Sequence, residues 1–120
     1  MAGKYDGKGM KYYKNGVKQY EGDFRDGKFE GKGIEYDRNS VKRYKGDFKT
    51  DEYNGKGIEY NKDGLKIYEG DFKDAWKDGK GILYHKNGEK RYQGDFKGGK
   101  CEGQGTKYWK NAFEKYEGGF

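Results

Sequence analysis

The sequence predicts an all-β protein, an elongated single-layer antiparallel sheet of stacked β-hairpins. Three observations support this prediction. A pair of motifs, Gly-x-Gly-x-x-Tyr followed by Tyr-x-Gly-x-Phe, recurs five times at a spacing of 24 residues. In most copies a dipeptide typical of tight turns lies between the two motifs. Aromatic residues (18%) supply most of the hydrophobic content (30%). A constant period of this length is typical of repeat proteins. We therefore treat residues 1–120 as one array of five units: 1–24, 25–48, 49–72, 73–96 and 97–120.

The composition argues against a large globular core, because 40% of the residues are charged and 23 are glycine. Disorder is also disfavoured, since disordered segments lack aromatic residues and this chain has 13 Tyr, 7 Phe and 2 Trp. No apolar run is long enough for a membrane-spanning helix or a signal peptide. The single cysteine, Cys101, cannot form an internal disulfide. We expect a soluble, cytoplasmic protein with a thin aromatic core.

Each unit reads as one β-hairpin. The first strand ends in the motif Gly-x-Gly-x-x-Tyr, and the second contains Tyr-x-Gly-x-Phe, as in Lys42 to Phe48. Between them stand dipeptides typical of hairpin tips, because Asn and Gly tolerate positive φ: Asn15-Gly16, Asn39-Ser40, Asp63-Gly64, Asn87-Gly88 and Asn111-Ala112. Ser40 and Ala112 fit a tight turn less well, so a longer loop is the alternative at these two tips.

The alternation of side chains predicts one aromatic face on the sheet. We place on it Ile34, Tyr36, Tyr44, Gly46 and Phe48, and on the other face Glu35, Asp37, Lys45 and Asp47. The glycines would leave room for a ring from the neighbouring unit. Because a lone hairpin is marginal in water, the units must stack edge to edge, each adding roughly 9–10 Å. A sandwich or closed barrel is the alternative, but translationally equivalent units favour the open array.

The stretch Tyr-Glu-Gly-Asp-Phe-Arg-Asp-Gly-Lys-Phe-Glu-Gly-Lys-Gly at residues 20–33 closely resembles the MORN (membrane occupation and recognition nexus) repeat, and the resemblance covers the whole chain. The chain differs in having Phe24 and its equivalents for the usual Trp, units one residue longer, and Asp51 and Ala75 for the loop glycine. The resemblance implies a scaffold that binds partner proteins or associates with membranes and the cytoskeleton. It also implies elongated dimers, here a homodimer through the array ends.

Catalytic motifs are weak. Gly-x-Gly binds nucleotides only between a strand and a helix, and no helix is expected. His85 and Cys101 each occur in a single unit and lack partners for a triad or a metal site. The Asp23, Asp47, Asp71 and Asp95 series fits structural hydrogen bonding better than glycosidase chemistry. We predict a protein that is not an enzyme, with no catalytic residues, no metal and no cofactor.

The first functional hypothesis is a groove of accessible rings that binds an extended peptide or an amphipathic helix of a partner protein. The predicted groove residues are Tyr12, Tyr20, Phe24, Tyr36, Tyr44, Phe48, Tyr60, Tyr68, Phe72, Tyr84, Tyr92, Phe96 and Tyr108. For most of these rings, packing in the only available core is the simpler interpretation.

The alternative is peripheral binding to acidic phospholipids through one cation at each hairpin tip. The predicted lipid contacts are Lys14, Arg38, Lys62, Lys86 and Lys110. Lysines that keep an exposed sheet soluble are the simpler explanation of this series. Nucleic acid is disfavoured as a partner, since the formal charges of the five units run +2, +2, −2, +2 and +2 and leave no unbroken basic track.

Overall fold

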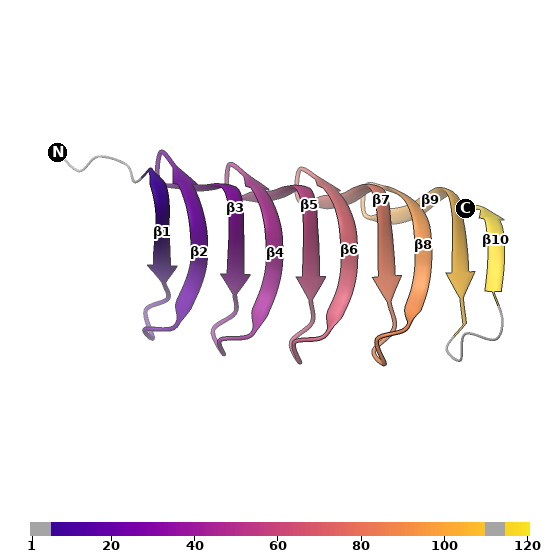
Figure 1. Cartoon of the computed structure of the whole chain (residues 1–120), viewed down its shortest axis with the longest axis horizontal. Helices are drawn as coiled ribbons and strands as arrows, with labels where there is room; N and C mark the ends of the chain where they lie inside the picture. Colours follow the sequence, from indigo (N-terminus) through magenta and orange to yellow (C-terminus); the bar gives the residue numbers. More distant parts are fainter. Residues whose placement is uncertain (1–5, 110–114) are drawn as a thin grey trace.

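The computed structural model describes residues 6–109 and 115–120, which form one ten-stranded antiparallel sheet with the strands in chain order (Figure 1). The sheet measures 59 × 26 × 16 Å. The prediction of an elongated, open single-layer sheet of hairpins is confirmed. Its strands are β1 (Gly7–Tyr12), β2 (Lys18–Arg25), β3 (Lys28–Tyr36), β4 (Lys42–Lys49), β5 (Glu52–Tyr60), β6 (Lys66–Lys73), β7 (Trp76–Tyr84), β8 (Lys90–Lys97), β9 (Lys100–Tyr108) and β10 (Lys115–Gly119).

The four described hairpin tips, each between the two halves of a unit, share one turn. In the tip between β3 and β4, Asp37 N donates to Val41 O (2.8 Å) and Ser40 N donates to Asp37 O (3.0 Å). Ser40 adopts a φ of 68°, the conformation that Gly16 takes in the first tip. The loop at Ser40 is therefore no longer than the others, and Ala112 lies outside the described residues.

At the ends of the strands away from these tips, two-residue turns join successive hairpins. Asp26 and Gly27 connect β2 to β3, both with positive φ (52° and 79°). This pattern fits a two-residue hairpin turn whose twist matches that of the strands. β3 begins at Lys28, directly after this turn.

The core is a row of rings on one side of the sheet, here called the aromatic face. Tyr20 is fully buried and lies stacked on Phe29, with ring centroids 3.8 Å apart and an interplanar angle of 4°. Phe48 of the next unit meets the Tyr20 ring edge-on at 5.1 Å. The buried hydrophobic residues are Tyr20, Phe24, Phe29, Tyr44, Phe48, Tyr68, Phe72, Tyr92 and Phe96. Each unit therefore buries its rings against those of its neighbour.

Glycines make this close packing possible. A Cβ atom added to Gly33 would lie 2.3 Å from Oη of Tyr20 and 2.4 Å from its ring carbons. The same relation holds between Gly57 and Tyr44. The prediction that glycine makes room for the ring of a neighbouring unit is confirmed at these positions.

The predicted assignment of side chains to faces is wrong for β3. Residues directly opposite each other in an antiparallel pair share a face. Glu35 pairs with Tyr20 on one side and Tyr44 on the other, so it lies on the aromatic face. Ile34 pairs with Glu21 and Lys45 and lies on the opposite side, here called the groove face. A register difference of one residue is enough to exchange the two faces.

Candidate functional site

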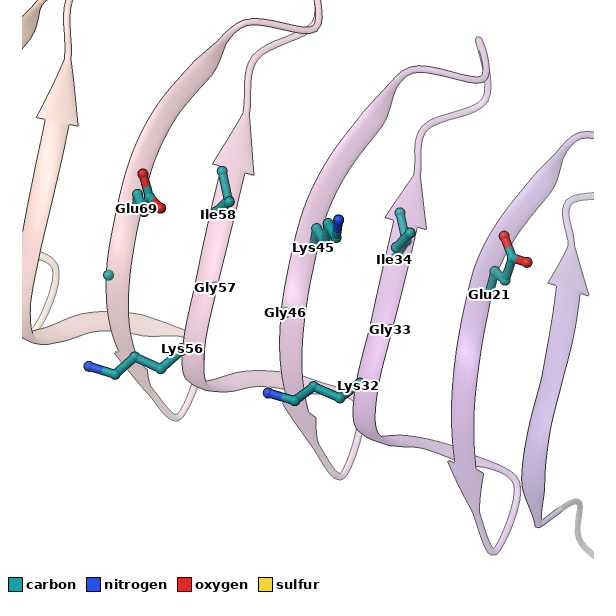
Figure 2. Close-up of a pocket in the computed structure, with 11 residues that line it drawn as sticks. Glu21, Lys32, Gly33, Ile34, Lys45, Gly46, Lys56, Gly57, Ile58 and Glu69 are labelled. Carbon is teal, nitrogen blue, oxygen red and sulfur yellow. The ribbon is translucent and has the colours of Figure 1, made fainter.

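The groove face carries a shallow, open groove of about 560 Å³ that crosses β2 to β6. A row of side chains runs along it, one from each of five neighbouring strands: Glu21, Ile34, Lys45, Ile58 and Glu69. Figure 2 shows this row beside the glycines, with Lys32 and Lys56 extending on the other side of them. Along the groove, the charged side chains of Glu21, Lys45 and Glu69 thus alternate with the apolar side chains of Ile34 and Ile58.

The glycine backbone forms the floor of the groove. Gly33, Gly46 and Gly57 are opposite one another in successive strands, and all three line the groove. A Cβ atom at Gly33 or Gly57 would meet the ring of Tyr20 or Tyr44 on the aromatic face, and one at Gly46 would meet the backbone of Lys56 and Gly57. The same glycines therefore pack the core on one side and leave the floor bare on the other.

An ion pair holds the glutamate at each end of the row. Lys18 Nζ lies 3.0 Å from Glu21 Oε1, and Lys66 Nζ lies 3.1 Å from Glu69 Oε1. These contacts raise the pKa of both lysines, chiefly through the hydrogen bond to the glutamate. Lys45, at the centre of the row, forms no ion pair with any residue that the structure describes. It is the cation of the row that is available to a ligand.

A second row of alternating tyrosines and lysines borders the groove. Lys18 Nζ lies 5.7 Å from the centroid of the Tyr36 ring, and Lys42 Nζ lies 5.5 Å from that of Tyr60. At this separation a lysine is attracted to the ring face. Tyr84 in the same column donates from its hydroxyl to Glu69 Oε1 at 3.2 Å, which links this row to the groove.

The structure separates the predicted groove residues into two groups. The first lies in the core, where a partner cannot contact its members: Tyr20, Phe24, Tyr44, Phe48, Tyr68, Phe72, Tyr92 and Phe96. The second consists of half-buried or exposed tyrosines: Tyr12, Tyr36, Tyr60, Tyr84 and Tyr108. Tyr36, Tyr60 and Tyr84 carry lysines from the row beside the groove, so they lie on the groove face. The two groups do not form one groove floor.

The predicted lipid contacts lie where the tips were expected. Lys14, Arg38, Lys62 and Lys86 are all exposed, and Lys110 lies outside the described residues. The Arg38 guanidinium sits 4.8 Å from the centroid of the Tyr13 ring in the preceding tip. Each of the four described tips therefore presents a cation to solvent.

Sequence reasoning missed the row of groove residues itself. Glu21, Lys45 and Glu69 immediately follow the tyrosines of the core column, so alternation along one strand already predicts that they face away from it. Ile34 and Ile58 could be placed only with the register between strands, which the sequence does not state. The charge alternation at 24-residue spacing was the available signal.

The recurring aspartates have a structural role. Asp47 Oδ2 accepts a hydrogen bond from Lys56 N (3.0 Å), and its backbone oxygen accepts one from Tyr44 Oη (2.7 Å). Asp95 repeats both contacts with Gln104 N and Tyr92 Oη. Within residues 6–109 and 115–120, no group of three or more His, Cys, Asp or Glu side chains could hold a metal ion.

An open β-sheet of equivalent hairpins, with a core of rings on one face and a groove lined by charged and apolar side chains on the other, defines a repeat protein with an extended exposed surface. The MORN repeat model matches residues 1–18, 20–41, 44–66, 68–90 and 92–111. The chain therefore belongs to the MORN repeat family, whose repeats are generally non-catalytic binding scaffolds. A comparison with curated proteins found no match. In the part of the chain that the structure describes, no helix is long and apolar enough to cross a bilayer.

Proposed function

We propose that this chain is a non-catalytic scaffold that binds a segment of a partner protein in the groove across β2 to β6. The observation that carries the proposal is the pair of apolar side chains, Ile34 and Ile58, that line the groove on the face opposite the core. The rings stabilise the sheet by packing on the aromatic face, so the exposed surface of Ile34 and Ile58 is not needed for that packing. Apolar surface of this kind, bordered by charge, is typical of a binding groove.

The tyrosines of the bordering row support the same function. Tyr36 and Tyr60 are half-buried beside the groove, each with a lysine over its ring. A tyrosine offers a large apolar surface with a polar end and loses little conformational freedom on binding. A partner segment in the groove would contact these rings at its side rather than the core rings predicted from sequence.

The test is selection of random peptides on the immobilised chain, followed by binding to a variant with a less apolar groove. Ile34→Thr with Ile58→Thr suits this purpose, because Thr106 occupies the same column in the last unit. Selected peptides should bind this variant at least about tenfold more weakly, since two apolar side chains each lose buried surface. Val41→Thr with Leu65→Thr is the matched control, with its changes at the hairpin tips. Peptides that bind both variants equally, or no selected peptide at all, would overturn the proposal.

Acidic phospholipid is the second candidate ligand, supported by the exposed cations at the four described tips. None of Lys14, Arg38, Lys62 and Lys86 forms an ion pair with another described residue, so each is available to a phosphate group. Each cation near an acidic bilayer contributes about 1 kcal/mol. Vesicles with and without phosphoinositide, sedimented with the chain at low and near-physiological salt, test this function. Binding should be lost when all four cations are replaced by Gln, and the Ile34→Thr, Ile58→Thr variant should bind normally.

A further inference from the structure

We propose that the segment accepted by the groove is an amphipathic α-helix lying along the long axis of the sheet. Its facing side chains would be basic, acidic and basic, opposite Glu21, Lys45 and Glu69. This inference rests on the proposed function and adds the conformation and the charge pattern of the partner. Three features of the groove support it: the pairing of the strands beneath it, the spacing of its side chains and their charges.

The pairing of the strands disfavours an extended partner. Every strand from β2 to β6 is paired with a neighbour on both sides, so its backbone N–H and C=O groups are already used in the sheet. An extended peptide gains affinity mainly by adding to a free strand edge. On this floor its own backbone groups would lose water without finding partners. A helix satisfies those groups internally and can bury an apolar side on the floor.

The spacing of the groove matches that of a helix. Ile34 and Ile58 lie two strands apart, and so do Lys45 and either glutamate. Two strand spacings amount to about 9.6 Å. Seven residues of α-helix rise about 10.5 Å. A helix with a seven-residue repeat therefore presents one equivalent side chain to each unit, and about 13 residues span the distance from Glu21 to Glu69.

The charges select among such helices. Lys45 has no ion-pair partner in the described structure, whereas Glu21 and Glu69 are each held by a lysine of the same strand. A carboxylate on the partner helix would thus gain most at Lys45. Cations on the helix would replace Lys18 and Lys66 at the two glutamates. The central pair is expected to contribute the largest part of the charge selectivity.

Designed peptides of about 20 residues test the inference. The matched peptide carries Lys, Glu and Lys at seven-residue spacing, with Leu at the intervening groove-facing positions. A second peptide has Lys at all three charged positions, and a third has the matched composition with two central prolines that prevent a helix. Affinity is measured by fluorescence anisotropy and helix content by circular dichroism. The matched peptide should bind and gain helix, and the proline peptide should not bind.

The central charge is tested by exchange. Lys45→Glu should weaken the matched peptide and strengthen the all-lysine peptide, each by roughly three- to tenfold. Lys97→Glu makes the same charge change at the exposed end of β8, outside the groove, and should alter neither affinity by more than about twofold. Equal effects of the two variants would overturn the assigned charge pattern.

Failure of the helix inference can be told from failure of the proposed function. If the proline peptide binds as tightly as the matched one, or if the selected peptides that depend on Ile34 and Ile58 stay non-helical when bound, the helix is wrong and the groove remains a binding site. If neither designed nor selected peptides depend on these two isoleucines, both proposals are wrong.

Discussion

The N-terminal and C-terminal halves of the array bury equivalent tyrosines against different side chains. In the N-terminal half, Tyr20 stacks on Phe29 and Tyr44 stacks on Tyr53, in both cases with ring centroids 3.8 Å apart. The equivalent partner of Tyr68 is Lys77, whose Nζ lies 5.4 Å from the ring centroid, and that of Tyr92 is Cys101, which is packed against the core.

The edge-on contact with the phenylalanine of the next unit changes little along the array. Its centroid distance is 5.1 Å for Tyr20 and Phe48, 5.4 Å for Tyr44 and Phe72, 5.1 Å for Tyr68 and Phe96, and 5.0 Å for Tyr92 and Phe120. The tyrosines, phenylalanines and glycines thus build the sheet, while the stacked position decides how strongly successive units adhere. In a linear array, stability is roughly the sum of unit and interface contributions. The N-terminal interfaces should therefore be the more stable ones.

Removing the side chain that packs on the buried tyrosine should give the largest difference in unfolding free energy between the two halves. Phe29→Ala removes a buried ring that also contacts Phe24 and Phe48 edge-on, and it should cost about 3–5 kcal/mol of unfolding free energy. Cys101→Ala removes one sulfur atom at the equivalent position and should cost about 1 kcal/mol. Urea unfolding followed by circular dichroism measures both changes. Equal losses would show that the stacked position does not set the interface strength.

The second prediction concerns Lys77, which occupies the position that Tyr53 has in the preceding unit. Glu59 Oε1 is buried, and Lys77 Nζ at 3.4 Å pairs with it without hydrogen-bond geometry. One unit earlier, Tyr53 donates from its hydroxyl to Glu35. Lys77→Tyr should stack on Tyr68, bond Glu59 and stabilise the chain by about 1 kcal/mol.

Lys77→Leu is the matched control for this change. It fills the stacked position but leaves the Glu59 carboxylate buried without a donor, and it should destabilise the chain by about 1–3 kcal/mol. Urea midpoints compare the two variants under the same conditions. A tyrosine variant no more stable than the leucine variant would contradict the assigned role of the Glu59 contact.

The turns between hairpins also differ between the two halves, with a smaller expected effect on stability. Gly27 and Ala75 are equivalent positions with φ values of 79° and 74°, a conformation that strains alanine and not glycine. Ala75→Gly should stabilise the chain by about 0.5–1 kcal/mol, and Gly27→Ala should destabilise it by a similar amount. Thermal unfolding of both variants tests this pair. The Ala75 N–H bond to Tyr53 O remains available in the glycine variant, so the backbone strain is the main change.

The sequence alone predicted the features that repeat and missed those that depend on register. The period, the tips and the ring-over-glycine packing follow from residues such as Gly33 and Tyr44, which recur in every unit. The face of Ile34 depends instead on which residue it opposes, and irregularities at Asp23 and beside Tyr36 shift that pairing. A repeat cannot reveal such a shift, because it is the same in every unit. Of the predicted groove rings, those in the column of Tyr44 are therefore buried in the core, while the charged residues that follow them in the sequence line the groove.

Acid sensitivity should be the property that the two halves share, since the aspartate contacts recur in both. The pKa of Asp95 is lowered by the hydrogen bond from Lys80 and by Gln104 N–H, and that of Asp23 by Lys8 and by Lys32 N–H. For Asp71, burial raises the pKa, but bonds from Lys56 and Lys80 N–H lower it overall.

A carboxyl group whose pKa is lower in the folded state adds stability above its unfolded pKa, and this stability is lost as the pH falls through the folded value. The urea concentration at which half of the wild-type chain is unfolded should therefore decrease as the pH is lowered below about 4. Asp95→Asn keeps an acceptor for Gln104 N–H but cannot ionise, so its midpoint should fall less steeply over the same range. Asp63→Asn removes the same charge from an exposed tip and should follow the wild type. Because these carboxylates are only partly buried and their lysine partners are exposed, the effect should be the smallest of the four, and it should weaken in high salt.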